Sequence, residues 1–136
     1  MQRDDIEVEL MANSAAFGYN AFDTMTIYND RAMLVRSVKK ASKRVDIFHV
    51  HNEPDWLVPA VREATNKPIV YDIHDLESFR WQREPDQDEI DSFKMSDAWV
   101  HVSEPCAVEA EKLHGTDKPA TVLPSYVNAT FYGPSP

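Results

Sequence analysis

The segment from Val45 to Arg80 constrains the fold more than any other part of the chain. It contains two short apolar runs, IFHVH and IVYDI, each followed by polar and ionisable residues, with a helix-length segment between them. Short apolar strands separated by helices are typical of a parallel sheet that is covered on both faces. Ligands of such sheets bind beyond the carboxyl ends of the strands. The sequence therefore predicts an α/β fold with a mostly parallel sheet, helices on both faces, and a binding site at the polar ends of these two strands.

The same alternation continues on either side of this segment. Strands are expected near Val45–His51, Pro68–His74, Ala98–Ser103 and Ala120–Leu123, and helices over Asp55–Thr65, Asp86–Met95 and Pro105–Gly115. The front of the chain predicts a half-exposed strand at Ile6–Leu10, a loop at Asn13–Asp23, a short strand at Met25–Tyr28 and a helix at Arg31–Arg44. We expect one domain over residues 1–136, with residues 1–30 irregular, a β/α core at 45–127 and a tail at 128–136.

Charge and composition exclude several classes of protein. The net charge of -9 argues against binding to a nucleic-acid backbone, which favours clusters of Lys and Arg. No apolar run approaches the roughly 20 residues that span a bilayer, and the N-terminal residues lack the apolar centre of a signal peptide. The single cysteine, Cys106, cannot form an internal disulfide, so a cytoplasmic location is expected.

Polar residues follow three of the predicted strands and form the candidate site. They are His51, Asn52 and Glu53 after the first strand, His74, Asp75, Glu77, Ser78 and Arg80 after the second, and Ser103 and Glu104 after the third. A carboxylate among them can act as a base on a hydroxyl group, and Arg80 with Arg83 can bind a phosphate. The alternative is structural: Asp75, Ser78 and Ser103 are also good helix caps, and the two arginines fit ordinary surface positions.

His49 and His51 share one face of their strand, because side chains alternate along it. His49 is the deeper of the two, and we expect it to be a core residue with its polar atoms satisfied. A His-x-His pair can also begin a zinc site, to which Asp72, His74 and Asp75 could contribute. Metal hydrolases with this strand pattern usually need a barrel of about 200 residues or more. We therefore expect no metal, and a small metal-dependent hydrolase is the least favoured function.

The sequence predicts different locations for two tryptophans, and it predicts that Cys106 is not a nucleophile. Trp99 lies within a predicted strand and is expected in the core, whereas Trp81 is flanked by polar residues and is expected at the surface, where it can stack on a sugar. Cys106 has no nearby histidine pattern that would activate it as a nucleophile.

Four segments resemble, in order, the amino-terminal domain of family-4 glycosyltransferases: DIFHVHNEPDWLVPAV, PIVYDIHDLESFR, SDAWVHVSEPCAVEAEKLHG and ATVLPSYVNATFYGP. The resemblance covers Val45 to Pro134. It implies the GT-B architecture, in which two Rossmann-like domains face each other across a cleft. The amino-terminal domain mainly holds the acceptor, the carboxyl-terminal domain holds the nucleotide-sugar donor, and no metal is generally required. His74 matches a family histidine near the transferred sugar, which implies a catalytic role.

The chain also departs from that family. No strand leading into a Gly-rich loop precedes Ile6, and the sequence has 3 glycines in all. The residues that grip the nucleotide sugar have no counterpart. The resemblance thus implies the acceptor-side half of a transferase, which needs a separate donor domain, or a non-catalytic binding or assembly module on the same fold. The family's first strand lies between its second strand and the DIFHVH strand. Without it we expect a rearranged sheet or two unpaired edges, and association as a homo-oligomer or with a partner chain that completes the sheet.

Overall fold

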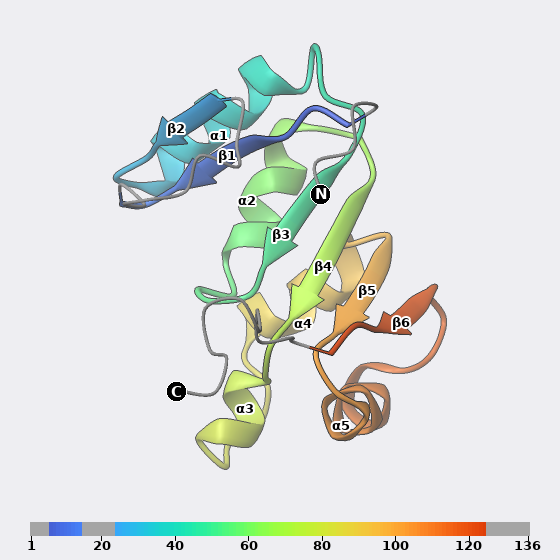
Figure 1. Cartoon of the computed structure of the whole chain (residues 1–136). Coiled ribbons are helices and arrows are strands. Elements are labelled where there is room, and N and C mark those ends of the chain that lie inside the picture. The colour runs from blue at the N-terminus through green and yellow to red at the C-terminus, as the bar shows by residue number, and fades with distance from the viewer. Residues whose placement is uncertain (1–5, 15–23, 125–136) are drawn as a thin grey trace, which may run out of the picture.

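A computed structural model describes residues 6–14 and 24–124. In these ranges the chain alternates between strands and helices (Figure 1). The strands are β1 (Glu9–Ala12), β2 (Thr24–Ile27), β3 (Phe48–His51), β4 (Ile69–Ile73), β5 (Ala98–His101) and β6 (Ala120–Val122). The helices are α1 (Arg31–Ala41), α2 (Leu57–Ala64), α3 (Glu77–Arg80), α4 (Gln87–Met95) and α5 (Glu104–His114).

The strands form two separate parallel sheets. Strands β3, β4, β5 and β6 pair in that order, and β1 pairs with β2. The register sets His51 opposite Asp72 and Ile73 opposite His101. Because all strands of the larger sheet run the same way, their carboxyl ends meet at one edge, which lies at the lower end of β3 and β4 in Figure 1.

The helices pack against one another and link the two sheets. Helix α1 packs on α2, and α2 packs on α4. One buried core joins residues of both parts, among them Tyr28, Leu34, Val50, Tyr71 and Trp99. Apolar residues three or four apart direct Leu34, Val38 and Ala41 of α1 into this core. Asp30 caps the start of α1 by accepting a hydrogen bond of 2.7 Å from the Met33 N–H.

Strands β1 and β3 belong to different sheets and do not pair with each other in residues 6–14 and 24–124. In β3, the N–H groups of Phe48 and Asn52 bond to Pro68 and Asp72 on the β4 side, each at 2.9 Å. Peptide groups alternate between the two edges of a strand, so those of His49 and His51 point away from β4. Direct pairing of the first strand with β3 would indicate a rearranged sheet that is complete within this chain. The described residues do not show that pairing.

The structure confirms the predicted α/β class and the parallel strands, and it is consistent with a Rossmann-like fold. The front strand is shifted: β1 begins at Glu9, and Ile6 and Val8 precede it. Helix α1 ends at Ala41 rather than Arg44, whose guanidinium instead bonds Glu9 at 2.5 and 2.6 Å. The predicted loop at 13–23 and the tail at 128–136 lie largely or wholly outside the described residues.

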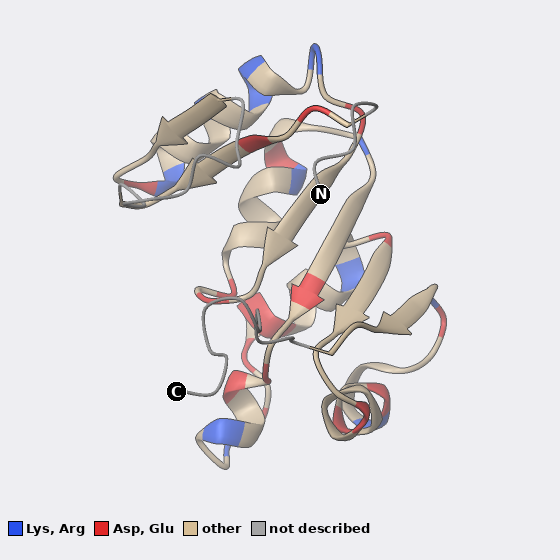
Figure 2. Ribbon diagram, viewed as in Figure 1, with Lys and Arg blue, Asp and Glu red and all other residues tan. Residues whose placement is uncertain are grey.

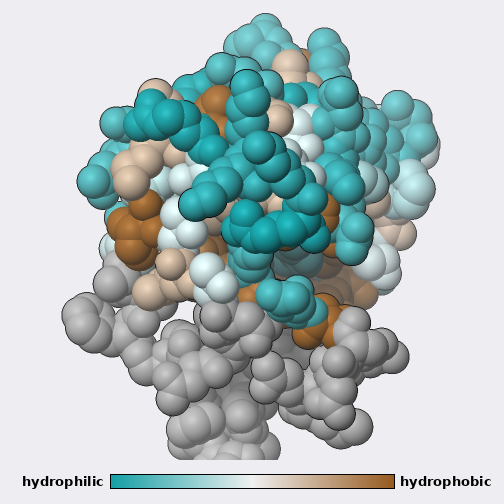
Figure 3. Space-filling model, turned by 90° about the horizontal axis from the view of Figure 1, so that it is seen from above, coloured by the Kyte–Doolittle hydropathy of each residue, from teal (hydrophilic) through white to brown (hydrophobic). Residues whose placement is uncertain are grey.

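Charge is unevenly distributed along the fold. Acidic residues gather around the carboxyl ends of β3 and β4, and α1 with the loop after it carries a group of basic residues (Figure 2). Seen from above, the surface is mostly hydrophilic with small apolar patches (Figure 3).

Trp99 is 2% exposed and Trp81 is 64% exposed, which confirms the two predicted locations.

Candidate functional site

His51 and His74 meet at the carboxyl ends of β3 and β4. His51 is the last residue of β3, and His74 directly follows β4. His51 Nδ1 lies 3.2 Å from His74 Nε2, so one of the two rings donates a hydrogen bond to the other. Both side chains remain exposed, by 65% and 54%. Partial desolvation lowers the pKa of His51, with the neighbouring Asp72 charge opposing the shift, and this favours the neutral ring.

Asn52 joins the two strand ends. Its Nδ2 donates to the backbone carbonyl of Asp75 at 2.9 Å, and its Oδ1 accepts from the N–H of His74 at 3.0 Å. The residue is 7% exposed. Asn52, predicted as a substrate contact, thus holds the positions of His74 and Asp75 and has both ends of its amide occupied.

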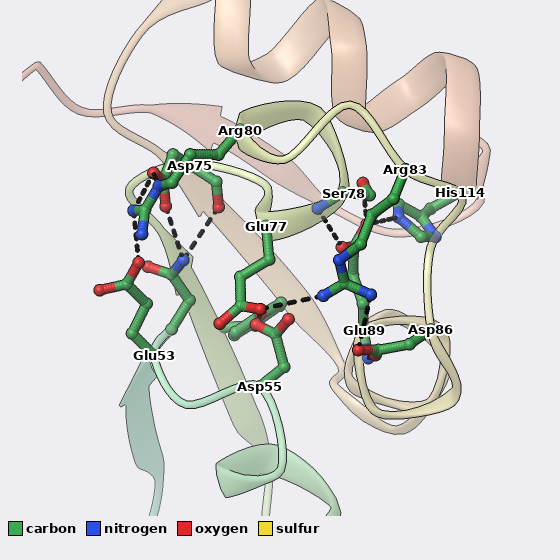
Figure 4. A network of polar contacts seen from close by, with 12 residues as sticks. Glu53, Asp55, Asp75, Glu77, Ser78, Arg80, Arg83, Asp86, Glu89 and His114 are labelled. Carbon is green, nitrogen blue, oxygen red and sulfur yellow. Dashed lines mark hydrogen bonds and ion pairs between the residues drawn. The ribbon is translucent and has the colours of Figure 1, made fainter.

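Arg80 is bound by two carboxylates from different loops. Its guanidinium contacts Asp75 and Glu53, as Figure 4 shows. Glu53, the second residue after β3, has a positive φ of 69°, so the backbone there turns sharply. The charge of Arg80 is already balanced by these partners, which reduces the attraction that it can offer to a phosphate.

The second set of predicted residues builds a buried network behind this edge. Ser78 is 2% exposed and donates from its hydroxyl to Glu89 at 2.8 Å. Glu89 also contacts His114 Nε2 at 3.0 Å (Figure 4). Glu77 pairs with Arg83 at 3.0 Å. These contacts fix α3 against α4 and α5. Ser78 thus has a structural role, but not the helix cap that the sequence suggested, because the N-cap of α3 is Leu76.

Ser103 and Glu104 lie at the start of α5. The Ser103 hydroxyl accepts a hydrogen bond of 3.3 Å from the Cys106 N–H, so Ser103 is the N-cap of this helix. Glu104 is exposed in its first turn. Burial raises the pKa of the Cys106 thiol, which agrees with an unreactive cysteine.

The expectation that His49 lies in the core was wrong. Its side chain is 49% exposed, and its Nε2 bonds Asp72 Oδ2 at 2.7 Å. Val50 and Tyr71 point into the helix-covered core, so His49, His51 and Asp72 occupy the opposite face of the strands. A residue inside a strand rather than at its end, such as His49, still has an exposed side chain when no described helix covers its face of the sheet.

Asp55 is a candidate that the sequence reading missed. It lies just before α2, is 7% exposed, and accepts a hydrogen bond of 3.3 Å from the Tyr71 hydroxyl. Burial raises its pKa to about 6, and the charges of Glu77 and Glu89 add to that shift. Strongly shifted carboxyls are typical of functional sites. The sequence contains no signal for this shift, because burial of Asp55 and the charges around it depend on residues far away along the chain.

Comparison with known proteins identifies one match. A family model described as Glycosyltransferase Family 4 matches residues 10–131. No curated protein and no solved structure matches the chain. Within the described residues, no helix is long and apolar enough to cross a membrane.

Proposed function

Because this chain belongs to glycosyltransferase family 4, we propose that it forms the acceptor side of a sugar-transfer cleft in a GT-B arrangement. A separate donor domain would bring the nucleotide sugar to the carboxyl edge of β3 and β4. The chain by itself would bind a sugar or glycoconjugate acceptor and would not transfer.

The contact between His51 and His74 carries this proposal. Two exposed imidazoles from neighbouring strand ends lie together where ligands of parallel sheets bind. They can donate and accept hydrogen bonds with the hydroxyl groups of a sugar. Asn52 holds the loop that carries His74, so the ring is positioned before a ligand arrives.

We propose a role for each group, and the role of His74 is the one that the family resemblance implies. His74 would offer a ring hydrogen bond to the donor sugar or to charge that develops during transfer. Asp75 and Glu77 are carboxylates of the candidate site that follow β4, and either would take the proton of the acceptor hydroxyl. Both pair with arginines, Asp75 with Arg80 and Glu77 with Arg83.

Saturation-transfer NMR on the isolated chain tests the acceptor role. We expect monosaccharides and short glycans to contact the protein, and UDP-glucose and GDP-mannose to show no binding through the nucleotide. His74→Ala should remove the sugar contacts. Lys39→Ala, on the exposed side of α1, is the matched control and should keep them. Tight nucleotide-sugar binding by the chain alone, or no sugar contact by the folded chain, would contradict the proposal.

A second candidate, an assembly module on the same fold, is favoured by the separated sheets. Among the described residues, β1 pairs only with β2 and β3 pairs only with β4, so each has an edge to which one more strand could add. We propose that another segment or a partner chain supplies it, since unpaired strand edges promote association. Analytical ultracentrifugation over a range of concentrations should show association. A protein that stays monomeric, with slow amide exchange at His49 and His51, would contradict this.

A further inference from the structure

Four potential metal ligands converge on the face of β3 and β4 that faces away from the core. The ligand atoms of His49, His51 and Asp72 all lie within 4.8 Å of one another. His49 Nε2 is 2.7 Å from Asp72 Oδ2, and His51 Nδ1 is 3.7 Å from the same oxygen. His74 Nε2 adds contacts of 3.2 Å to His51 Nδ1 and 3.5 Å to Asp72 Oδ1.

Three of these separations, measured to either oxygen of Asp72, are close to those of a tetrahedral site. With metal–ligand bonds of about 2.0–2.1 Å, two ligand atoms of a tetrahedral zinc ion lie about 3.3 Å apart. Three of the four separations, at 3.2, 3.5 and 3.7 Å, are within about 0.4 Å of this value. The fourth, from His49 to Asp72, is a direct hydrogen bond that a small ring rotation would open.

Asp72 supplies an independent observation. The residue is 8% exposed, and its Oδ1 has no hydrogen-bond partner among the described residues. A buried carboxylate oxygen without a partner is costly, and coordination to a cation is one of the ways in which proteins satisfy it. This oxygen is also the Asp72 atom closest to His74 Nε2. The unsatisfied atom therefore lies within the histidine cluster.

Hydrogen bonds alone leave the cluster incomplete. His49 can donate to Asp72 Oδ2, and His51 and His74 can share one proton between them. That arrangement still leaves Asp72 Oδ1 unpaired. A single cation would engage the lone pairs of the imidazoles and the carboxylate together.

We propose that His49, His51 and Asp72 bind a divalent transition-metal ion, with zinc as the best fit, and that His74 lies at the fourth position. Imidazole suits zinc among the available cations, and a single carboxylate beside histidines excludes the oxygen-rich sites of Ca²⁺ and Mg²⁺. The exposed rings leave the ion accessible from solvent. The proposal does not rest on sugar transfer, and the sequence alone had argued against a metal here.

Metal titration of the tag-free, chelator-treated protein tests this site. Co²⁺ should bind one to one and give the intense visible absorption of tetrahedral coordination, and added Zn²⁺ should displace it. Calorimetry with Zn²⁺ should give the same stoichiometry. His49→Ala, His51→Ala and Asp72→Asn should each weaken zinc binding at least about tenfold.

The control is Asp88→Asn, which removes an exposed carboxylate in the first turn of α4. It should bind zinc like the unmodified protein. Circular dichroism of each variant shows whether it folds, and His51→Gln replaces His51→Ala if the latter does not. Absence of one-to-one binding, octahedral Co²⁺ absorption, or equal losses in the control would overturn the proposal. These readouts involve no sugar, so they fail or succeed independently of the acceptor role.

Discussion

Replacing Asp55 with Asn should stabilise the fold at pH 8 and destabilise it at pH 4. Burial, with the charges of Glu77 and Glu89, raises the pKa of Asp55 from 3.8 to about 6 in the folded protein. The folded state therefore holds the proton more tightly than the unfolded chain does. Stability falls as pH rises through the window from 3.8 to about 6, and the loss is complete above it.

The size of the effect follows from the shift. The two pKa values differ by about 2 units, and each unit is worth about 1.4 kcal/mol, so ionised Asp55 destabilises the fold by about 3 kcal/mol. Asparagine removes the charge but places an amide N–H₂ where Oδ2 has no hydrogen-bond partner in the described chain. That unpaired donor costs about 1–2 kcal/mol. We expect Asp55→Asn to gain about 1–2 kcal/mol at pH 8 and to lose about 1–2 kcal/mol at pH 4.

Urea unfolding followed by tryptophan fluorescence at several pH values between 4 and 8 measures this difference. Asp88→Asn is the control, because its carboxylate is exposed, and its effect should vary by less than about 0.5 kcal/mol over the same range. A difference for Asp55→Asn that stays constant with pH, or that grows as the pH falls, would refute the reasoning.

Three further substitutions have distinct expected results in the same unfolding assay. Glu89→Gln should cost about 2 kcal/mol at pH 7. Burial opposes ionisation of Glu89, but hydrogen bonds from His114 and Ser78 lower its pKa. The stability that ionised Glu89 contributes is therefore present above pH 4.5 and is lost as the pH falls below that value. An equal cost at pH 3 would contradict this. Ser103→Ala should cost about 1 kcal/mol because it removes the cap of α5, whereas Ser103→Asn should retain most of the stability. Trp81→Ala should change stability by less than about 0.5 kcal/mol, since the ring is 64% exposed; a larger loss would show that it packs on the fold.

The sequence predicted the elements that hydrophobic pattern controls. The runs around Val50 and Ile73 became parallel strands, and the rule for carboxyl ends correctly placed His51 near His74. These features depend on local residues and on the general geometry of parallel sheets, so one sequence is sufficient to find them.

The failures came from properties that depend on distant parts of the chain. His49 is exposed because no described helix covers its face, and that depends on segments outside the strand. The pKa of Asp55 depends on carboxylates from α3 and α4. The pairing of β1 with β2, apart from β3, is likewise a property of the whole sheet. The hydrophobic pattern of the sequence therefore does not predict the exposure of His49, the pKa of Asp55 or the pairing of β1.

The bridge made by Asn52 makes the loops after β3 and β4 behave mechanically as one body. Its amide bonds both the N–H of His74 and the carbonyl of Asp75, so motion of either loop is transmitted to the other. A ligand that touches only one loop meets a surface whose shape is already set by both. Less conformational entropy is then lost on binding, because ordering of the second loop has already occurred during folding.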